Sequence, residues 1–271
     1  MDQIAAYYAQ NREHERLTRG SNQLEFERTR ELLARFLPPP PATVLDVGGG
    51  TGPYARPLLE EGYGVHLLDA APHHIERIRA DPSLAGLTSA TLGDARALPY
   101  PDASADAVLL LGPLYHLTGA DDRLRALTEA RRCLRPGGVV LAAAITRTAS
   151  TLDGLLAGLD ADERFRAMRN ATLEDGLHQP PDPTLGWFTT AYFHRPEELQ
   201  REVEEAGFRN VDLYAVEGLG NVVPDFETLW MDPARRGRLL DVIRRTERDP
   251  ALFGVSAHLL AVGYSPSPNP A

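Results

Sequence analysis

The chain has 271 residues with a formal net charge of −10, and its 28 basic residues are all arginine. The length fits one large domain or a core domain with a sizeable insertion, and the 43% of hydrophobic residues excludes wholesale disorder. The acidic balance argues against nucleic acid or an anionic membrane as a partner. The absence of lysine excludes Schiff-base chemistry and a P-loop lysine.

Cysteine and the terminal segments exclude further classes. Cys133 is the only cysteine, so the sequence has neither a disulfide framework nor a cysteine-based metal site. The N-terminus lacks the apolar core of a secretion signal, and the longest apolar runs are far shorter than a membrane span. We therefore expect a soluble cytoplasmic protein that holds no metal, and the sequence leaves its oligomeric state open.

The first half of the chain alternates between two patterns. Apolar residues at helical spacing predict an amphipathic helix over 24–37, before the prolines at 38–41. Beyond them, short apolar runs predict strands at 43–47, 64–68, 88–92, 105–111 and 138–145. Between the runs, helical patterns are predicted after Pro53, over 72–79 and over 122–134. Near-continuous apolar strands that alternate with helices predict a parallel sheet covered on both faces.

The alternation breaks between 147 and 195. This stretch predicts two short helices, a proline-rich loop and an aromatic segment, and we interpret it as a lid insertion. A helix over 196–206, a strand over 211–216 and a last strand over 256–263 follow. The predicted organisation is a helical cap at 1–37, a core at 42–146 and 196–264, the lid at 147–195, a second helical insertion at 225–248 and a disordered tail at 265–271.

The most informative segment is Val44-Leu45-Asp46-Val47-Gly48-Gly49-Gly50-Thr51-Gly52-Pro53, where a buried strand ends in glycines. Such glycines let a ligand approach backbone N–H groups at a helix N-terminus. A dinucleotide-binding loop would have its third glycine where this chain has Pro53. Asp69 ends the second strand, 21 residues after Gly48, where an acid can accept both hydroxyls of a ribose. Asp94 ends the third strand at the same edge of the sheet, and the two acids together favour a nucleoside site.

These features resemble the class I S-adenosylmethionine-dependent methyltransferases. The matching segments lie roughly within 40–145 and are 44–52, Leu68-Asp69, Gly93-Asp94-Ala95, 106–112 and Leu134-Arg135-Pro136-Gly137-Gly138. The resemblance implies a doubly wound α/β fold with a mostly parallel seven-stranded sheet. Its strand order would be 3-2-1-4-5-7-6, with the last strand antiparallel. The layout also resembles the tailoring methyltransferases of bacterial natural-product pathways.

The resemblance implies S-adenosyl-L-methionine as the cofactor. Asp46 would hold its ammonium group or shape the loop, and Asp69 would bind the ribose hydroxyls. Asp94 and the Ala95 N–H would bind the adenine, while Arg16 on the N-terminal helix would pair with the methionine carboxylate. The cofactor-binding residues expected on this basis are Arg16, Asp46, Gly48, Gly50, Asp69, Ala70, Asp94, Ala95 and Leu111.

Methyl transfer from a sulfonium is an in-line displacement, in which the enzyme aligns the acceptor and excludes water. A general base helps where the acceptor carries a proton, and His116 follows the fourth strand at the edge where such folds bind ligands. We predict His116 as this base; the alternative is a histidine that bonds the loop or lines the cleft. His194 is the second candidate, with a structural role at a helix entry as its alternative. The pair His73 and His74 is interpreted as a solvated helix start.

The acceptor follows by exclusion. No Asn-Pro-Pro-Tyr/Phe motif follows the fourth strand, and Cys133 is misplaced for pyrimidine C5 methylation. We expect an oxygen or nitrogen atom of a small molecule or peptide. The predicted substrate-binding residues are Tyr115, Trp187, Tyr192 and His194, and the aromatic residues of the insertion are equally compatible with a core of its own. The alternatives are a cofactor-binding protein without methyl transfer and a nicotinamide-dependent oxidoreductase, against which the position of Pro53 argues.

Overall fold

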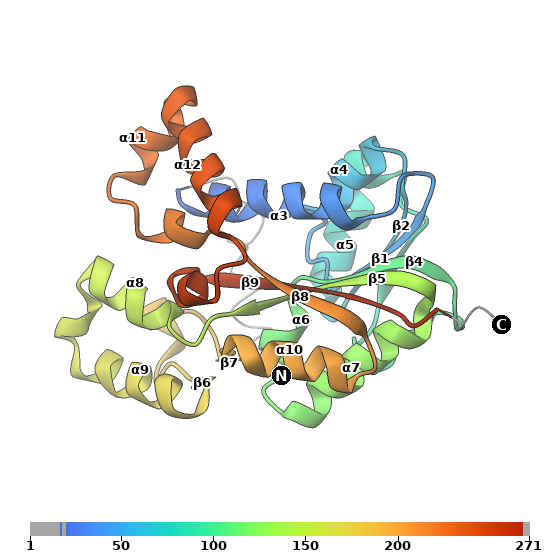
Figure 1. The fold of residues 1–271 in the computed structure, drawn as a ribbon. Helices are drawn as coiled ribbons and strands as arrows, with labels where there is room; N and C mark the ends of the chain where they lie inside the picture. Colours follow the sequence, from blue (N-terminus) through green and yellow to red (C-terminus); the bar gives the residue numbers. More distant parts are fainter. Residues whose placement is uncertain (1–16, 18–19, 268–271) are drawn as a thin grey trace. The chain divides into compact units, whose positions relative to one another are not determined.

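A computed structural model of the chain describes residues 17 and 20–267 (Figure 1). Seven strands form one sheet, and two short strands form a second sheet of their own. The strands of the large sheet are β1 (Thr43–Val47), β2 (Gly64–Asp69), β3 (Ser89–Leu92), β4 (Ala105–Leu110), β5 (Leu134–Ile145), β8 (Arg209–Ala215) and β9 (His258–Tyr264). The small sheet pairs β6 (Leu177–His178) with β7 (Ala191–Tyr192).

The helices follow the predicted ranges with one addition. They are α3 (Asn22–Phe36), α4 (Ala55–Glu60), α5 (Pro72–Ala80), α6 (Pro113–His116), α7 (Ala120–Cys133), α8 (Ala149–Ala157), α9 (Glu163–Asp175), α10 (Pro196–Glu205), α11 (Phe226–Met231) and α12 (Pro233–Thr246). The short helix α6 has no counterpart in the sequence prediction. Proline at the first turn of α5, α6 and α12 removes an N–H that has no partner within a helix. Among the described helices, none combines the length and the apolar character that a membrane crossing requires.

The large sheet has the hydrogen-bonded order β3-β2-β1-β4-β5-β9-β8. At its centre β1 runs parallel to both neighbours, so that Asp46 lies opposite Leu67 on β2 and Leu109 on β4. The residues of β1 from Val44 to Val47 are all buried, as in a strand that is covered on both faces. Without the short β6 and β7, this order is 3-2-1-4-5-7-6 with antiparallel strands at its end, which confirms the predicted fold class.

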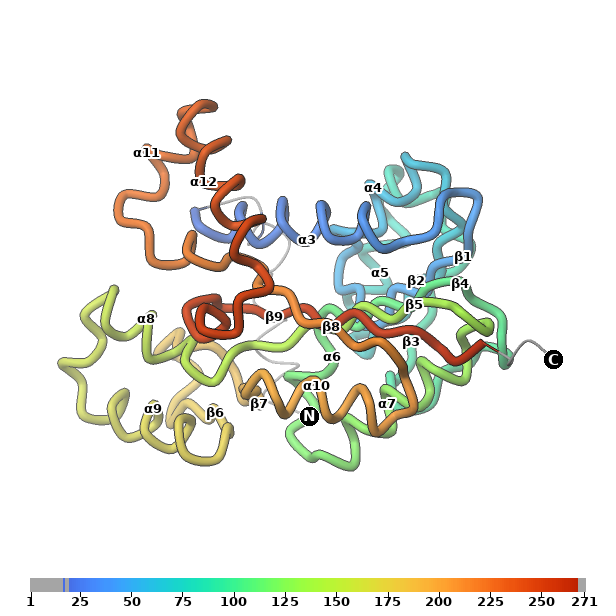
Figure 2. Tube along the Cα trace, in the orientation of Figure 1, coloured from blue at the N-terminus to red at the C-terminus, as the bar shows by residue number. Residues whose placement is uncertain are grey.

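The chain divides into two compact units. The first, which we call the glycine-loop unit, holds the described residues of 32–143, 199–212 and 261–271. The second, which we call the insertion unit, holds the described residues of 1–31, 144–198 and 213–260. The predicted lid and the predicted second helical insertion both fall in the insertion unit. Figure 2 follows the chain through both units.

A buried ion pair joins two helices of the glycine-loop unit. Arg123 on α7 is 2% exposed, and its Nε and Nη2 atoms donate to the Glu202 carboxylate on α10 at 2.6–3.0 Å. Its Nη1 atom donates to the carbonyls of Leu117 and Thr118 at 3.0 and 2.9 Å. Arg123 therefore also fixes the segment that directly follows α6. Cys133 is buried at the end of α7, as expected for a small core residue.

In the insertion unit, Arg147 holds the two ends of the predicted lid together. Its Nε atom donates to the Phe193 carbonyl at 2.7 Å, and its Nη2 atom pairs with Glu198 at 2.7 Å. A Cβ atom on Gly176 would lie 2.7 Å from Nη2, so this position needs glycine, which also suits its φ of +87°. A backbone hydrogen bond adds to these contacts, since the Arg147 N–H donates to the His194 carbonyl at 2.8 Å.

The predicted second helical insertion shares an apolar core with α3. Trp230 on α11 and three residues of α12 pack with Leu24 of α3. The buried members of this cluster are Leu24, Trp230, Leu239, Leu240 and Ile243. Leu24 is fully buried although it lies near the start of its helix, because α12 covers that face.

The C-terminal strand ends later than predicted. We expected a disordered tail from Ser265, whereas Ser265 is buried and continues the backbone pairing of β9. Its N–H donates to the Gly138 carbonyl at 2.8 Å, and its carbonyl accepts from the Gly137 N–H at 3.0 Å. These two glycines belong to β5, so Ser265 extends the pairing between β9 and β5.

Candidate active site

The glycine loop lies in the glycine-loop unit, at the edge where the parallel strands β1, β2 and β4 end. Gly48, Gly50 and Gly52 all have positive φ angles, from +56° to +80°, which explains why the loop is built from glycine. A Cβ atom on Gly48 would lie 2.7 Å from Cγ of Pro113, so the loop and the start of α6 are in close contact. A Cβ atom on Gly50 would meet no atom of the described residues within 4 Å. The loop is thus closed against the protein at Gly48 and open at Gly50.

Asp69, the last residue of β2, connects the loop to α5. Its Oδ2 atom accepts from the Gly50 N–H at 2.8 Å, and its Oδ1 atom accepts from the Ala71 N–H at 2.8 Å. Oδ1 also lies 3.0 Å from Nδ1 of His74. Asp69 is buried, whereas Ala70 beside it is exposed. The interpretation of His73 and His74 as a solvated helix start is wrong for His74, which is 5% exposed and supports Asp69.

Asp46 is the most isolated acid of this site. It is 1% exposed, and its Oδ2 atom has no hydrogen-bond partner among the described residues. Burial, with a smaller contribution from the charge of Asp69, raises the pKa of Asp46 to about 7. A Cβ atom on Gly49 would lie 2.7 Å from this oxygen, so the carboxyl group sits directly against the loop backbone. A cationic group at the loop would find an acceptor that the protein itself leaves unused.

Asp94 follows β3 and is held by an arginine two residues later. The carboxylate accepts from Arg96 through its backbone N–H at 2.8 Å and through Nε and Nη2 at 2.9 and 2.6 Å. These hydrogen bonds lower the pKa of Asp94, so it is ionised at neutral pH. Arg96 also pairs with Asp122 at 2.9 Å. Ala95 is buried beside the half-buried Asp94.

The segment after β4 forms the short helix α6 and carries the predicted base. The Tyr115 hydroxyl donates to the Leu111 carbonyl at 3.3 Å, and the Tyr115 ring meets the His116 ring edge-on at 4.6 Å. Burial lowers the pKa of His116 to about 4, although the charge of Asp69 acts in the opposite direction. The imidazole is therefore neutral at physiological pH and lies within electrostatic reach of Asp69.

Three predicted substrate residues belong to the insertion unit, and each has contacts there. Trp187 meets the Phe165 ring edge-on at 5.2 Å, and Tyr192 lies 3.2 Å from Arg147 Nη2 through its hydroxyl. His194 is fully buried and meets the Tyr192 ring edge-on at 4.8 Å. Their assignment to substrate binding stays a prediction. Arg16, predicted to bind the methionine carboxylate, lies outside the described residues.

The sequence prediction missed three contributors to this site. His74 supports Asp69, Arg96 holds Asp94, and Pro113 fills the space beside Gly48. The positions of His74 and Arg96, five and two residues after their acids, are the signal that was available. Pro113 had no such signal, because its contact with Gly48 spans 65 residues of sequence.

Comparisons with known proteins agree with this geometry. Residues 45–142 match a family described as a methyltransferase domain. Malonyl-[acyl-carrier protein] O-methyltransferase of Halorhodospira halophila is 30% identical over 212 residues, which cover 72% of this chain and 70% of that protein. The ubiquinone/menaquinone biosynthesis C-methyltransferase UbiE of a Caulobacter strain is 36% identical over 115 residues, covering 39% of this chain and 44% of that protein.

A solved structure extends the comparison to the whole fold. It is a chain in the complex between the Haloferax volcanii Trm112 methyltransferase activator and a methyltransferase. With 20% identity, it matches at a TM-score of 0.61 and covers 97% of this chain and 98% of its own. The fold is thus that of the class I methyltransferases. The chain belongs to the S-adenosylmethionine-dependent methyltransferases, and S-adenosylmethionine is its cofactor.

The described residues fit this cofactor. Among the described residues, none would contact a Cβ atom on Gly50 within 4 Å, and none bonds the buried Asp46 oxygen, which is compatible with a cationic group at the loop. Asp69 and Asp94 stand at the ends of the adjacent strands β2 and β3, which pair through Asp69 and Leu92. The cofactor supplies an activated methyl group when bound. The assignment of these side chains to its ammonium, hydroxyl and amino groups stays a prediction.

Proposed function

We propose that this methyltransferase transfers the methyl group to an oxygen or nitrogen atom of a small molecule or peptide. The observation that carries the proposal is the position of His116 on α6, which follows β4 and begins against Gly48 of the glycine loop; burial keeps its imidazole neutral. A neutral imidazole accepts a hydrogen bond from an acceptor hydroxyl or amine and orients it. The match over 212 residues to an O-methyltransferase supports oxygen.

The low pKa of His116 limits what it does as a base. A group whose conjugate acid has a pKa of about 4 takes a full proton only from an acidic acceptor. A carboxylic acid or a hydroxyl group with a low pKa meets this condition better than a simple alcohol does. We therefore propose that His116 mainly orients the acceptor. Alignment of the reacting groups then supplies much of the catalysis, because good positioning lowers the activation barrier by about 7–11 kcal/mol.

The first test replaces His116 by alanine. We expect kcat to fall by about 100-fold, because the acceptor loses the group that orients it, while the affinity for S-adenosylhomocysteine stays within about threefold. The acid limb of kcat/KM should lie near pH 4 rather than near the ordinary histidine value, because protonation removes the acceptor lone pair. The assay measures S-adenosylhomocysteine release with panels of carboxylic, phenolic and amine acceptors. Full turnover of His116→Ala would refute the role of His116 and leave the cofactor assignment intact.

The second test concerns Asp46 and proton linkage. We propose that Asp46 faces the ammonium group of the cofactor, which would favour the carboxylate and lower its pKa from about 7. Binding of S-adenosylhomocysteine at pH 7 should then release a fraction of one proton. Calorimetry in two buffers with different ionisation enthalpies measures this release, and Asp46→Asn should abolish it. Equal binding heats in the two buffers would contradict the assignment.

The pH dependence of the folding stability provides an independent test of the raised pKa of Asp46. Folding raises the pKa of Asp46 from 3.8 to about 7, so its contribution to stability is complete below pH 3.8 and is lost as the pH rises through 7. The Asp46→Asn variant lacks this loss. Its melting temperature relative to the parent chain should therefore increase between about pH 5 and about pH 8.

A further inference from the structure

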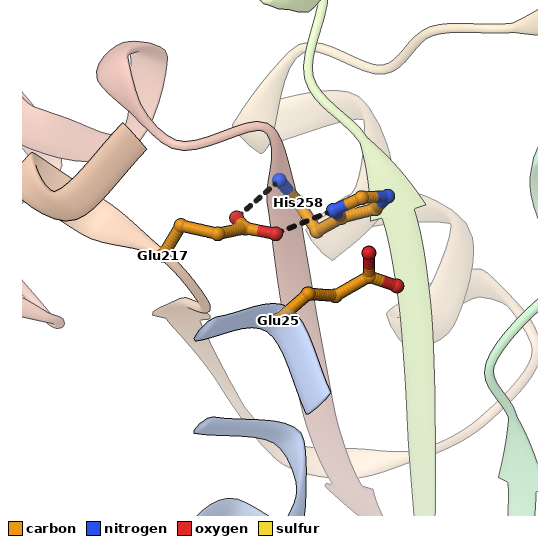
Figure 3. Close-up of side chains that lie close together, drawn as sticks. All are labelled: Glu25, Glu217 and His258. Atoms are coloured by element: carbon orange, nitrogen blue, oxygen red, sulfur yellow. Dashed lines mark hydrogen bonds and ion pairs between the residues drawn. The ribbon is translucent and has the colours of Figure 1, made fainter. Parts of the chain in front are cut away.

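A second cluster of chemically active side chains lies entirely within the insertion unit. It combines Glu25 of α3, Glu217 two residues after β8, and His258 at the start of β9 (Figure 3). One potential ligand atom from each residue lies within 4.8 Å of the others. The three residues are far apart in sequence, so the fold alone brings them together.

Glu217 fixes the orientation of His258. The Oε1 atom of this buried carboxylate accepts from Nδ1 of His258 at 2.6 Å, and Oε2 accepts from the His258 backbone N–H at 2.9 Å. Ser256 adds a hydrogen bond to Oε2 at 2.8 Å. Because a carboxylate only accepts, Nδ1 carries a proton, and Nε2 is the ring nitrogen that would bind a metal ion in its deprotonated form. A carboxylate behind a histidine is the usual outer partner of a metal-binding imidazole.

Acidic side chains lie close to His258 and Glu217. Glu25 is half-buried, and its carboxylate lies beside the His258 ring in Figure 3. Asp153 of α8 is close enough for the charges of His258 and Glu217 to affect it; burial, as the main cause, raises its pKa. The arginine one turn beyond Glu25, Arg28, is engaged by Glu31 and Glu247. Within the described part of the chain, Glu25, Glu217 and Asp153 therefore share this region with His258.

We propose that Glu25, Glu217 and His258 form a binding site for a divalent transition-metal ion such as Zn²⁺. Imidazole combined with carboxylates suits this class of ion, whereas Mg²⁺ and Ca²⁺ prefer oxygen ligands alone. Ligand bonds of about 2.0–2.2 Å require donor atoms roughly 3–4 Å apart, so the cluster closes with a small movement of the half-buried Glu25. The ion would connect α3 to the ends of β8 and β9, and it would stabilise the insertion unit.

The test uses the full chain, prepared without a histidine tag and dialysed against a chelator. Calorimetry with Zn²⁺ should give one ion per chain, and Co²⁺ should produce visible absorption bands from an imidazole-containing site. Zn²⁺ should also raise the melting temperature, and Mg²⁺ should not. Glu25→Gln and His258→Ala should each weaken Zn²⁺ binding by at least about 10-fold.

Glu27→Gln is the matched control, because Glu27 lies two residues further along the same helix and outside the cluster. It should bind Zn²⁺ like the parent chain. Replacing the buried Glu217 risks misfolding of the chain. The variant of the half-buried Glu25 is therefore the decisive one, and circular dichroism checks that this variant is folded. Absence of stoichiometric binding, or equal binding by the Glu25, His258 and Glu27 variants, would overturn the proposal. These readouts involve no methyl transfer, so their outcome is separate from that of the acceptor assay.

Discussion

Replacing Asp69 by alanine is expected to weaken S-adenosylhomocysteine binding by about 100-fold or more. A hydrogen bond to a charged group is worth about 1.5–3 kcal/mol, and two ribose hydroxyls would bind this carboxylate, so the loss reaches about 3 kcal/mol. The same substitution removes the acceptor of the Gly50 and Ala71 N–H groups and the partner of His74. The loop therefore loses its support together with the ribose contact. Calorimetric titration with S-adenosylhomocysteine measures the change.

Two further variants serve as controls for the loss of affinity in Asp69→Ala. Asp69→Asn keeps one acceptor oxygen and most of the shape, so it should bind better than Asp69→Ala but less tightly than the parent chain. Asp121→Asn changes an exposed aspartate of the same unit and should leave the affinity unchanged. An affinity of Asp69→Ala within threefold of the parent value would contradict the cofactor site proposed here.

Replacing Arg123 by alanine should lower the free energy of unfolding by about 3–5 kcal/mol. The substitution leaves the buried Glu202 carboxylate without its bidentate partner, and it frees the carbonyls of Leu117 and Thr118. Urea denaturation followed by circular dichroism measures the change. Because Arg123 holds the segment after His116, kcat should fall more than the affinity for S-adenosylhomocysteine.

The double variant Arg123→Met/Glu202→Leu tests whether the unpaired Glu202 carboxylate causes the loss of stability in Arg123→Ala. Replacing both charges by apolar groups removes the uncompensated charge, so it should recover most of the lost stability. Arg125→Ala, on the exposed side of the same helix, should change stability by no more than about 0.5 kcal/mol. A cost below about 1 kcal/mol for Arg123→Ala would show that the pair contributes little to folding.

The positions of the first strands could be predicted because their signals are local, whereas the strand order was implied by the resemblance to the methyltransferases. Runs of four to six residues, mostly apolar in β1, β2 and β4, alternate with helical patterns, and the glycine turn precedes α4. Asp69 could be placed at a ligand-binding edge for the same reason, because it directly follows the apolar run of β2.

The remaining features depend on contacts between distant parts of the chain. Nothing near Glu25 in the sequence indicates His258, and the low pKa of His116 results from burial that no local pattern reveals. The helix α6 is only four residues long, too short for a periodic signal. No local pattern distinguishes Arg147 from the other arginines of the insertion, because its partners Phe193 and Glu198 lie 46 and 51 residues further along the chain.

The backbone pairing at the base of the predicted lid makes that insertion an exchangeable module. The chain leaves the sheet after Ile145, and His194 returns to it by donating to the Ile145 carbonyl at 2.8 Å. Because the two ends meet there, doubling the length of the intervening segment costs only about 0.6 kcal/mol in closure entropy. We therefore expect that chimeras joined at Thr146 and His194 fold with the same order of strands in the sheet.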